Sequence, residues 1–155
     1  MPFFDDFLNA AREMAIKTHG YYATPPGATR ALLARERFEG VILEPCSGGG
    51  AMSRVLEEAG YIVASSDIRD EVYGEGGIDV FSLGGPYENA VTNPPVRDAA
   101  AIAEHLLAIT TVKVALLMPW HLLPTLARRP RDLAPGNLDA SLEQRGRIAR
   151  HAVSL

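Results

Sequence analysis

Short apolar runs alternate with segments of helical spacing through the middle of the chain. Runs rich in β-branched residues predict buried strands, and apolar residues three or four positions apart predict helices with one apolar face. The pattern predicts strands at 41–43, 61–66, 78–81, 90–92 and 111–118, where 78–81 is either a short strand or the end of one. It predicts helices at 28–35, 51–59 and 98–109, with His105 as a packing residue on the last.

This order of elements predicts an α/β fold with an open, mostly parallel sheet of at least five strands and helices on both faces. Residues 41–66 have the pattern of a strand, a helix and a strand, which form a right-handed crossover between parallel strands. Parallel strands end at the same edge, and open α/β sheets bind ligands there. We therefore expect the functional residues at the carboxyl ends of the strands.

Both ends of the chain lie outside this array. Residues 3–17 predict an N-terminal helix, and its apolar stripe fits core packing better than a partner-binding face. Thr24-Pro25-Pro26 predicts an extended passage, because a proline disfavours helix at the residue before it. Residues 119–155 predict a loop at 128–137 and a helix at 138–153, with no clear pair of strands.

The composition predicts one globular domain over residues 1–155, since 47% of the residues are hydrophobic and 22% are charged. A single cysteine excludes an internal disulfide, and no apolar run is long enough to span a membrane. The first residues lack the basic region of a secretion signal. We expect a cytoplasmic protein with no membrane partner.

The net charge of −4 is unevenly distributed. Residues 119–155 carry six arginines against three acidic residues, which gives +3, so residues 1–118 carry −7. A basic tail could contact nucleic-acid phosphates. A solvated basic surface explains the tail equally well, because no aromatic residues lie between the arginines.

The first strand leads into Glu44-Pro45-Cys46-Ser47-Gly48-Gly49-Gly50, and a helix follows. A glycine turn lets the backbone approach a ligand closely, and the N-terminus of the next helix offers unpaired N–H groups. The turn therefore predicts a nucleotide-like ligand, although glycine turns of this kind also occur for structural reasons alone.

Two acidic residues follow later strands. Asp67 comes 17 residues after Gly50, at a position where a carboxylate can accept from both hydroxyls of a ribose. Asp79 could accept from the amine of an adenine, with Ile68 and Phe81 as apolar neighbours of the ring. Both acids could instead cap turns, and a ribose fits NAD as well as S-adenosylmethionine.

Asn93-Pro94-Pro95 directly follows a buried strand. The lone pair of an amine on an aromatic ring or an amide is delocalised and a poor nucleophile. Carbonyl oxygens of Asn93 and Pro94 that accept from this amine would favour a tetrahedral nitrogen with an available lone pair. The motif predicts chemistry at a planar amine, although Asn-Pro also opens ordinary turns.

Together these motifs resemble the class I S-adenosylmethionine-dependent methyltransferases, chiefly the DNA adenine-N6 methyltransferases and similar small phage or prophage proteins. The resemblance covers roughly residues 21–120. It rests on motifs in the order that the family uses, namely Thr24-Pro25-Pro26, Glu44 to Gly50, Ser66-Asp67, Asp79-Val80-Phe81 and Asn93-Pro94-Pro95-Val96. It implies a Rossmann-like methyltransferase fold whose terminal β-hairpin is reduced or absent here.

The resemblance also implies the role of each motif. Thr24 and Pro25 would lie near the methionine end of the cofactor. Glu44 and Gly48 to Gly50, with Pro45 and Cys46, would hold the methionine amine and line its path. Asp67 would bind the ribose, and Asp79 and Phe81 would bind the adenine with Ile68 and Val80 beside them. Asn93, Pro94, Pro95 and Val96 would form the acceptor site. No metal is needed, and DNA is a better expected partner than RNA.

Two departures from the family pattern affect these expectations. The fourth motif usually ends in an aromatic residue that stacks on the flipped-out base, and here that residue is Val96. Residues 119–155 show no terminal hairpin, so an exposed sheet edge could pair with a second copy of the chain. No residues remain for a target-recognition domain.

Three alternatives stay open. The chain could methylate a glutamine side chain of a protein, or RNA. It could bind the cofactor without catalysis and act through its surface. A nicotinamide-dependent enzyme fits less well, because Gly48-Gly49-Gly50 lacks the wider glycine spacing and Asn93-Pro94-Pro95 would have no role.

Overall fold

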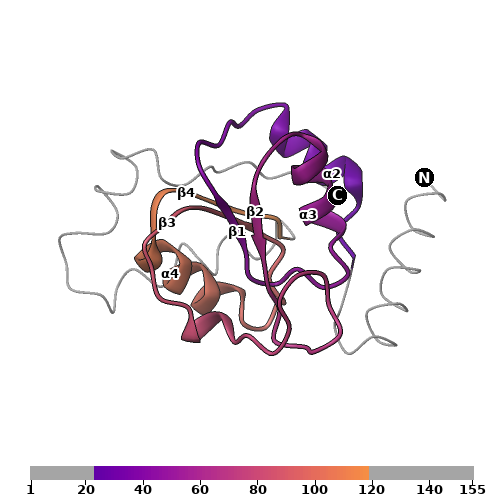
Figure 1. Cartoon of the computed structure of the whole chain (residues 1–155). Helices are drawn as coiled ribbons and strands as arrows, with labels where there is room; N and C mark the ends of the chain where they lie inside the picture. The colour runs from indigo at the N-terminus through magenta and orange to yellow at the C-terminus, as the bar shows by residue number, and fades with distance from the viewer. Residues whose placement is uncertain (1–22, 119–155) are drawn as a thin grey trace.

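The computed structural model describes residues 23–118, which form a parallel sheet covered by helices (Figure 1). The predicted N-terminal helix and the basic tail lie outside these residues. In chain order the elements are α2 (Pro26–Leu33), β1 (Ile42–Glu44), α3 (Ala51–Glu58), β2 (Val63–Ser65), the 3-10 helix η1 (Val80–Ser82), β3 (Tyr87–Thr92), α4 (Ala99–Ile109) and β4 (Thr110–Leu116).

The strands lie in the order β2-β1-β3-β4, and all neighbouring pairs are parallel. The chain moves outward from β1 to β2, returns to the other side of β1 for β3, and moves outward again to β4. The order therefore reverses between β1 and β3, which is where open α/β sheets place their ligands. The predicted parallel sheet is confirmed.

The prediction of at least five strands is wrong for residues 23–118, where the sheet has four. Residues expected as a strand at 78–81 instead enter η1, because the Asp79 side chain accepts from the backbone N of Phe81 at 2.9 Å. This local bond competes with a sheet ladder. Before it, pairing beside β2 is limited to one parallel bridge between Ser66 and Glu75.

Alternate residues of the strands supply two separate cores. Ile42, Val91 and Ala115 lie in a cluster with residues of α2 and α3. Their neighbours Leu43, Ala90 and Val114 lie in a second cluster with Ile102 and Leu106 of α4. Successive side chains of a strand point to opposite faces, so both faces are buried, as apolar runs without alternation predict. Helices on both faces are confirmed.

Element ends differ from the predictions for identifiable reasons. Helix α2 begins at Pro26, because a proline is tolerated at the first helical position. Strand β3 begins at Tyr87 and so includes the buried Asn89, whose Nδ2 donates to the carbonyl of Glu39 at 2.6 Å.

None of the helices within residues 23–118 has the length and apolar character that a membrane span requires.

A polar contact ties β4 to the segment between α2 and β1. Lys113 Nζ lies 2.6 Å from a carboxylate oxygen of Glu36 and 3.0 Å from the carbonyl oxygen of Arg37. The same ammonium is 5.4 Å from the ring centroid of the buried Phe38. The charged pair is mostly shielded from water, so solvent and salt screen its attraction less than that of an exposed pair.

We predict that Lys113→Ala destabilises the fold by about 1–3 kcal/mol, because Glu36 loses this partner in a poorly solvated position. Urea denaturation measures the free energy of unfolding. Lys113→Met keeps the aliphatic stem over Phe38, so the difference between the two variants separates packing from charge. A Lys113→Ala variant as stable as wild type would contradict a stabilising contact.

Candidate functional site

Four motifs from distant parts of the chain lie along the carboxyl edge of the sheet, in two hydrogen-bonded pairs. The backbone N of Gly48 donates to Oδ2 of Asp67 at 2.9 Å, which joins the glycine turn to the end of β2. Nδ2 of Asn93 donates to Oγ1 of Thr24 at 3.1 Å, which joins the end of β3 to the segment before α2. Between them, the Cys46 thiol lies near the hydroxyl of Thr92 at the end of β3.

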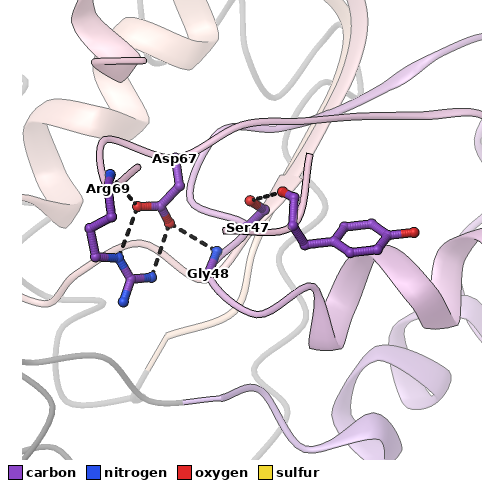
Figure 2. Close-up of polar contacts among 5 residues, drawn as sticks. Ser47, Gly48, Asp67 and Arg69 are labelled. Carbon is purple, nitrogen blue, oxygen red and sulfur yellow. Dashed lines mark hydrogen bonds and ion pairs between the residues drawn. The ribbon is translucent and has the colours of Figure 1, made fainter. Parts of the chain in front are cut away.

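Asp67 is the most heavily hydrogen-bonded of the predicted site residues (Figure 2). Besides Gly48, it accepts from the backbone N, Nε and Nη2 of Arg69 at 3.0, 3.1 and 3.2 Å. Burial alone would raise the pKa of Asp67, but the hydrogen bonds from Arg69 and Gly48 outweigh it and hold this pKa below its usual value. The carboxylate therefore stays charged and fixes the turn.

The glycine turn is covered on one side by the chain's own loop. The backbone N of Tyr73 donates to the carbonyl of Gly48 at 2.8 Å, and the side-chain hydroxyl of Ser47 donates to the carbonyl of Tyr73 at 2.7 Å. Gly50 has a φ of 80°, and a Cβ placed there would collide with Tyr73. The glycine at this position is therefore required by the fold itself, whatever binds at the turn.

Tyr73 is held in place by two residues of α3. Its hydroxyl donates to Oε2 of Glu57 at 2.5 Å, and the guanidinium carbon of Arg54 lies 4.5 Å from its ring centroid. Acceptance of this bond by the Glu57 carboxylate raises the pKa of Tyr73. Gly50, Arg54 and Glu57 lie on one side of the helix, since they are spaced by four and three residues.

Glu44 lies beneath the turn, between β1, β2 and α3. It is 2% exposed and accepts from the hydroxyl of Ser53, which also lies 2.7 Å from the hydroxyl of Ser65. Burial raises the pKa of Glu44 to about 7, and the charges of Asp67 and Glu57 add to this effect. This carboxyl group is turned toward α3, and its predicted contact with a methionine amine stays a prediction.

Pro45 and Cys46 lie between Glu44 and the glycine turn. Pro45 is fully buried, and Cys46 is half-buried against the core cluster on the α4 side. Burial raises the pKa of the Cys46 thiol to about 11, so the thiol stays protonated at neutral pH. A thiol is a poor nucleophile compared with its thiolate, so Cys46 is not expected to act as a nucleophile. The predicted contact of Pro45 and Cys46 with a cofactor stays a prediction.

The residues predicted around an adenine lie beside Asp67. The backbone N of Ile78 donates to the carbonyl of Asp67 at 2.9 Å, which brings residues 78–81 next to Ile68 along the edge. Ile68 and Phe81 are large apolar side chains that remain exposed, while Val80 is buried in the core. Phe81 packs against His105 with ring centroids 5.6 Å apart, as expected for a packing histidine.

Asn93 is partly buried, and the two prolines after it differ in burial. Pro94 is buried and Pro95 is exposed. Val96 is 55% exposed and is therefore not part of the packed core. Thr24, which contacts Asn93, is 6% exposed.

Three residues that take part in the site were not predicted: Arg69, Tyr73 and Ser53. Arg69 has a weak sequence signal, since it follows Asp67 by two positions. Tyr73 is the one aromatic residue in the charged, glycine-rich loop 69–77. Ser53 has no signal, because a serine in a helix gives no sign of the carboxylate that it contacts.

In residues 23–118 no group of three or more His, Cys, Asp or Glu could hold a metal ion.

The raised pKa of Glu44 predicts that stability falls as the pH rises. The folded state holds its proton up to about pH 7, whereas the unfolded state loses it near the ordinary value of 4.5. Between these values the folded state binds more protons, so raising the pH destabilises it by a total on the order of 3 kcal/mol. Glu44→Gln, which stays neutral, should lose this decline.

Urea denaturation at pH 5 and pH 8 measures the effect. We expect Glu44→Gln to be more stable than wild type at pH 8 and close to it at pH 5. Glu58→Gln makes the same chemical change at an exposed position and serves as the control. The same pH dependence in wild type and in Glu44→Gln would exclude Glu44 as its source.

Comparisons with known proteins leave the family open. No protein-family model matches the chain, and a search of curated proteins found no match. Function is therefore inferred from the geometry of residues 23–118.

Proposed function

We propose that the chain binds S-adenosylmethionine at the carboxyl edge of its sheet and transfers the methyl group to an exocyclic amine. The first acceptor to test is adenine N6 in DNA. The observation that carries the proposal is the hydrogen bond between Asn93 and Thr24, which joins two motifs 69 residues apart. An Asn-Pro-Pro sequence that only opened a turn would not need this contact.

The chemistry of the available groups fits this cofactor. Asp67 offers a charged carboxylate for a ribose diol once Arg69 yields its place. The Arg69 side chain is 45% exposed although that of Asp67 is only 7% exposed, so the guanidinium can leave toward water, and the two ribose hydroxyls would replace the hydrogen bonds that it gives up. Ile68 and Phe81 are exposed apolar side chains beside Asp79, which suits the faces and the amine of an adenine.

When bound, S-adenosylmethionine would supply a methyl group attached to a positively charged sulfur. The sulfur would keep the electron pair of the broken C–S bond and leave as a neutral thioether. The chain's part is to orient the acceptor. Oδ1 of Asn93 accepts from the NH₂ group and favours a lone pair aimed at the methyl carbon. As the N–C bond forms, the nitrogen loses one proton to water.

Val96 favours a second acceptor, the side-chain amide of a glutamine in a protein. A flipped-out base loses about 1–3 kcal/mol of stacking when an aliphatic residue replaces an aromatic one. An amide has no aromatic ring to stack, so the lack of an aromatic residue at Val96 weakens the binding of an amide little.

Binding of the cofactor without methyl transfer is the third possibility, and RNA is a further acceptor class. The single cysteine agrees with a cytoplasmic site of action.

We predict that the wild-type chain binds S-adenosylmethionine and its demethylated product, but not NAD, in calorimetry. Transfer of a labelled methyl group to DNA, RNA and a protein extract identifies the acceptor class. Asn93→Ala should lower the rate by about 10²- to 10³-fold, as removal of one positioned catalytic hydrogen-bonding group does. Its cofactor affinity should stay unchanged.

Asn93→Asp is the matched control, because it keeps an acceptor oxygen at the same position and should retain more activity than Asn93→Ala. Binding of the cofactor without transfer by the wild type would support the non-catalytic alternative. Binding of NAD with no response to S-adenosylmethionine would exclude the proposal.

We also predict that Arg69→Ala binds S-adenosylmethionine about 2- to 5-fold more tightly than wild type, because the guanidinium no longer competes for Asp67. Titration calorimetry measures the affinity. Arg30→Ala removes the same charge from α2, where Arg30 faces Glu58 at the far end of α3, and should leave the affinity unchanged. Weaker binding by Arg69→Ala would show that Arg69 supports the ligand instead of competing with it.

A further inference from the structure

We propose that Thr24 is a positioning residue that holds the Asn93 amide through its Nδ2, so that Oδ1 faces the acceptor amine. This inference rests on the proposed function. It goes beyond the role that the family resemblance implies for Thr24, which is a place near the methionine end of the cofactor. The hydroxyl of Thr24 contacts Asn93, so its effect should be on the acceptor side of the site.

The two ends of an asparagine amide are similar in size and opposite in hydrogen bonding. Oδ1 only accepts, and Nδ2 only donates. An acceptor NH₂ group approaching Nδ2 would meet another donor, so the amide is useful in one orientation only. Because Nδ2 of Asn93 donates to Oγ1 of Thr24, Oδ1 is turned away from Thr24 and is available to an amine.

Thr24 is suited to hold this orientation because its own position is fixed. Its side chain is 6% exposed, so water competes little for the hydrogen bond. Pro25, at φ −58° and ψ 133°, restricts Thr24 to an extended conformation, and Pro26 begins α2. Helix α2 is anchored in turn, since Ala28 and Leu32 are buried in the core cluster with α3.

The contact also links the end of β3 to the segment before α2. Asn93 follows β3 in the middle of the sheet, whereas Thr24 precedes a helix on the α2 and α3 face. An amide at the end of a strand is otherwise free to rotate about its last side-chain bond. Loss of the Thr24 hydroxyl should therefore leave the backbone in place and release only the amide.

The test uses Thr24→Val, which removes the hydroxyl at nearly constant shape, and Thr24→Ser, which keeps it. The control is Thr29→Val, because the buried hydroxyl of Thr29 on α2 has no hydrogen-bond partner among the described residues. Thr24→Ala is a second variant for the case in which Thr24→Val fails to fold.

The first readout needs no substrate. Asn93→Ala identifies the side-chain NH₂ signals of Asn93 in a ¹⁵N-labelled NMR spectrum. We expect these signals to shift and to exchange faster with water in Thr24→Val and Thr24→Ala, and to stay near wild type in Thr24→Ser and Thr29→Val. Unchanged Asn93 signals in Thr24→Val would overturn the inference, whatever the chain's activity.

The second readout is methyl transfer to the acceptor that the wild type uses. We expect Thr24→Val to lower kcat about tenfold, the equivalent of one lost hydrogen bond, with calorimetric affinity for S-adenosylmethionine unchanged. A weaker affinity with an unchanged kcat would overturn the inference, because Thr24 would then act on the cofactor. A wild type that binds no S-adenosylmethionine would instead exclude the proposed function, and the NMR readout would still decide the contact.

Discussion

The hydrogen bonds to the Asp67 carboxylate are the interactions on which the carboxyl edge of the sheet depends. The carboxylate receives the backbone N–H of Gly48 from one side and the guanidinium of Arg69 from the other. A buried carboxylate is costly unless hydrogen bonds satisfy it, and here one of these bonds also ties the glycine turn to the end of β2. The acid at the end of β2 thus determines the shape of the loop after β1.

Beneath this edge, a second carboxyl group behaves in the opposite way. Glu44 has less hydrogen-bonding support for its charged form than Asp67, so burial dominates and its pKa rises to about 7. Two acidic residues near each other at the ends of adjacent strands are therefore driven apart in pKa by their surroundings. The charged one organises the loop, and the neutral one packs helix α3 against the sheet through Ser53.

Much of this architecture could be predicted from the sequence, because apolar runs and glycine turns depend on the conformational preferences and burial of neighbouring residues. The parallel strands follow from the order of the elements, whereas the contact of Thr24 with Asn93 does not, because Thr24 precedes the first strand. The predicted strand at 78–81 was wrong, because the Asp79 side chain accepts a hydrogen bond from the backbone N of Phe81 and so replaces a partner strand. The orientation of Glu44 and the contacts of Arg69 and Tyr73 depend on loop paths, which periodicity does not encode.

The position of Tyr73 has a consequence for the direction from which any molecule can approach the glycine turn. Its ring covers Gly50 and the adjoining side of α3, and Arg54 and Glu57 anchor it there. Gly49 is the glycine of the turn that remains exposed. Access is thus one-sided: a molecule that reaches the turn would contact it at Gly49, on the side that Tyr73 leaves uncovered.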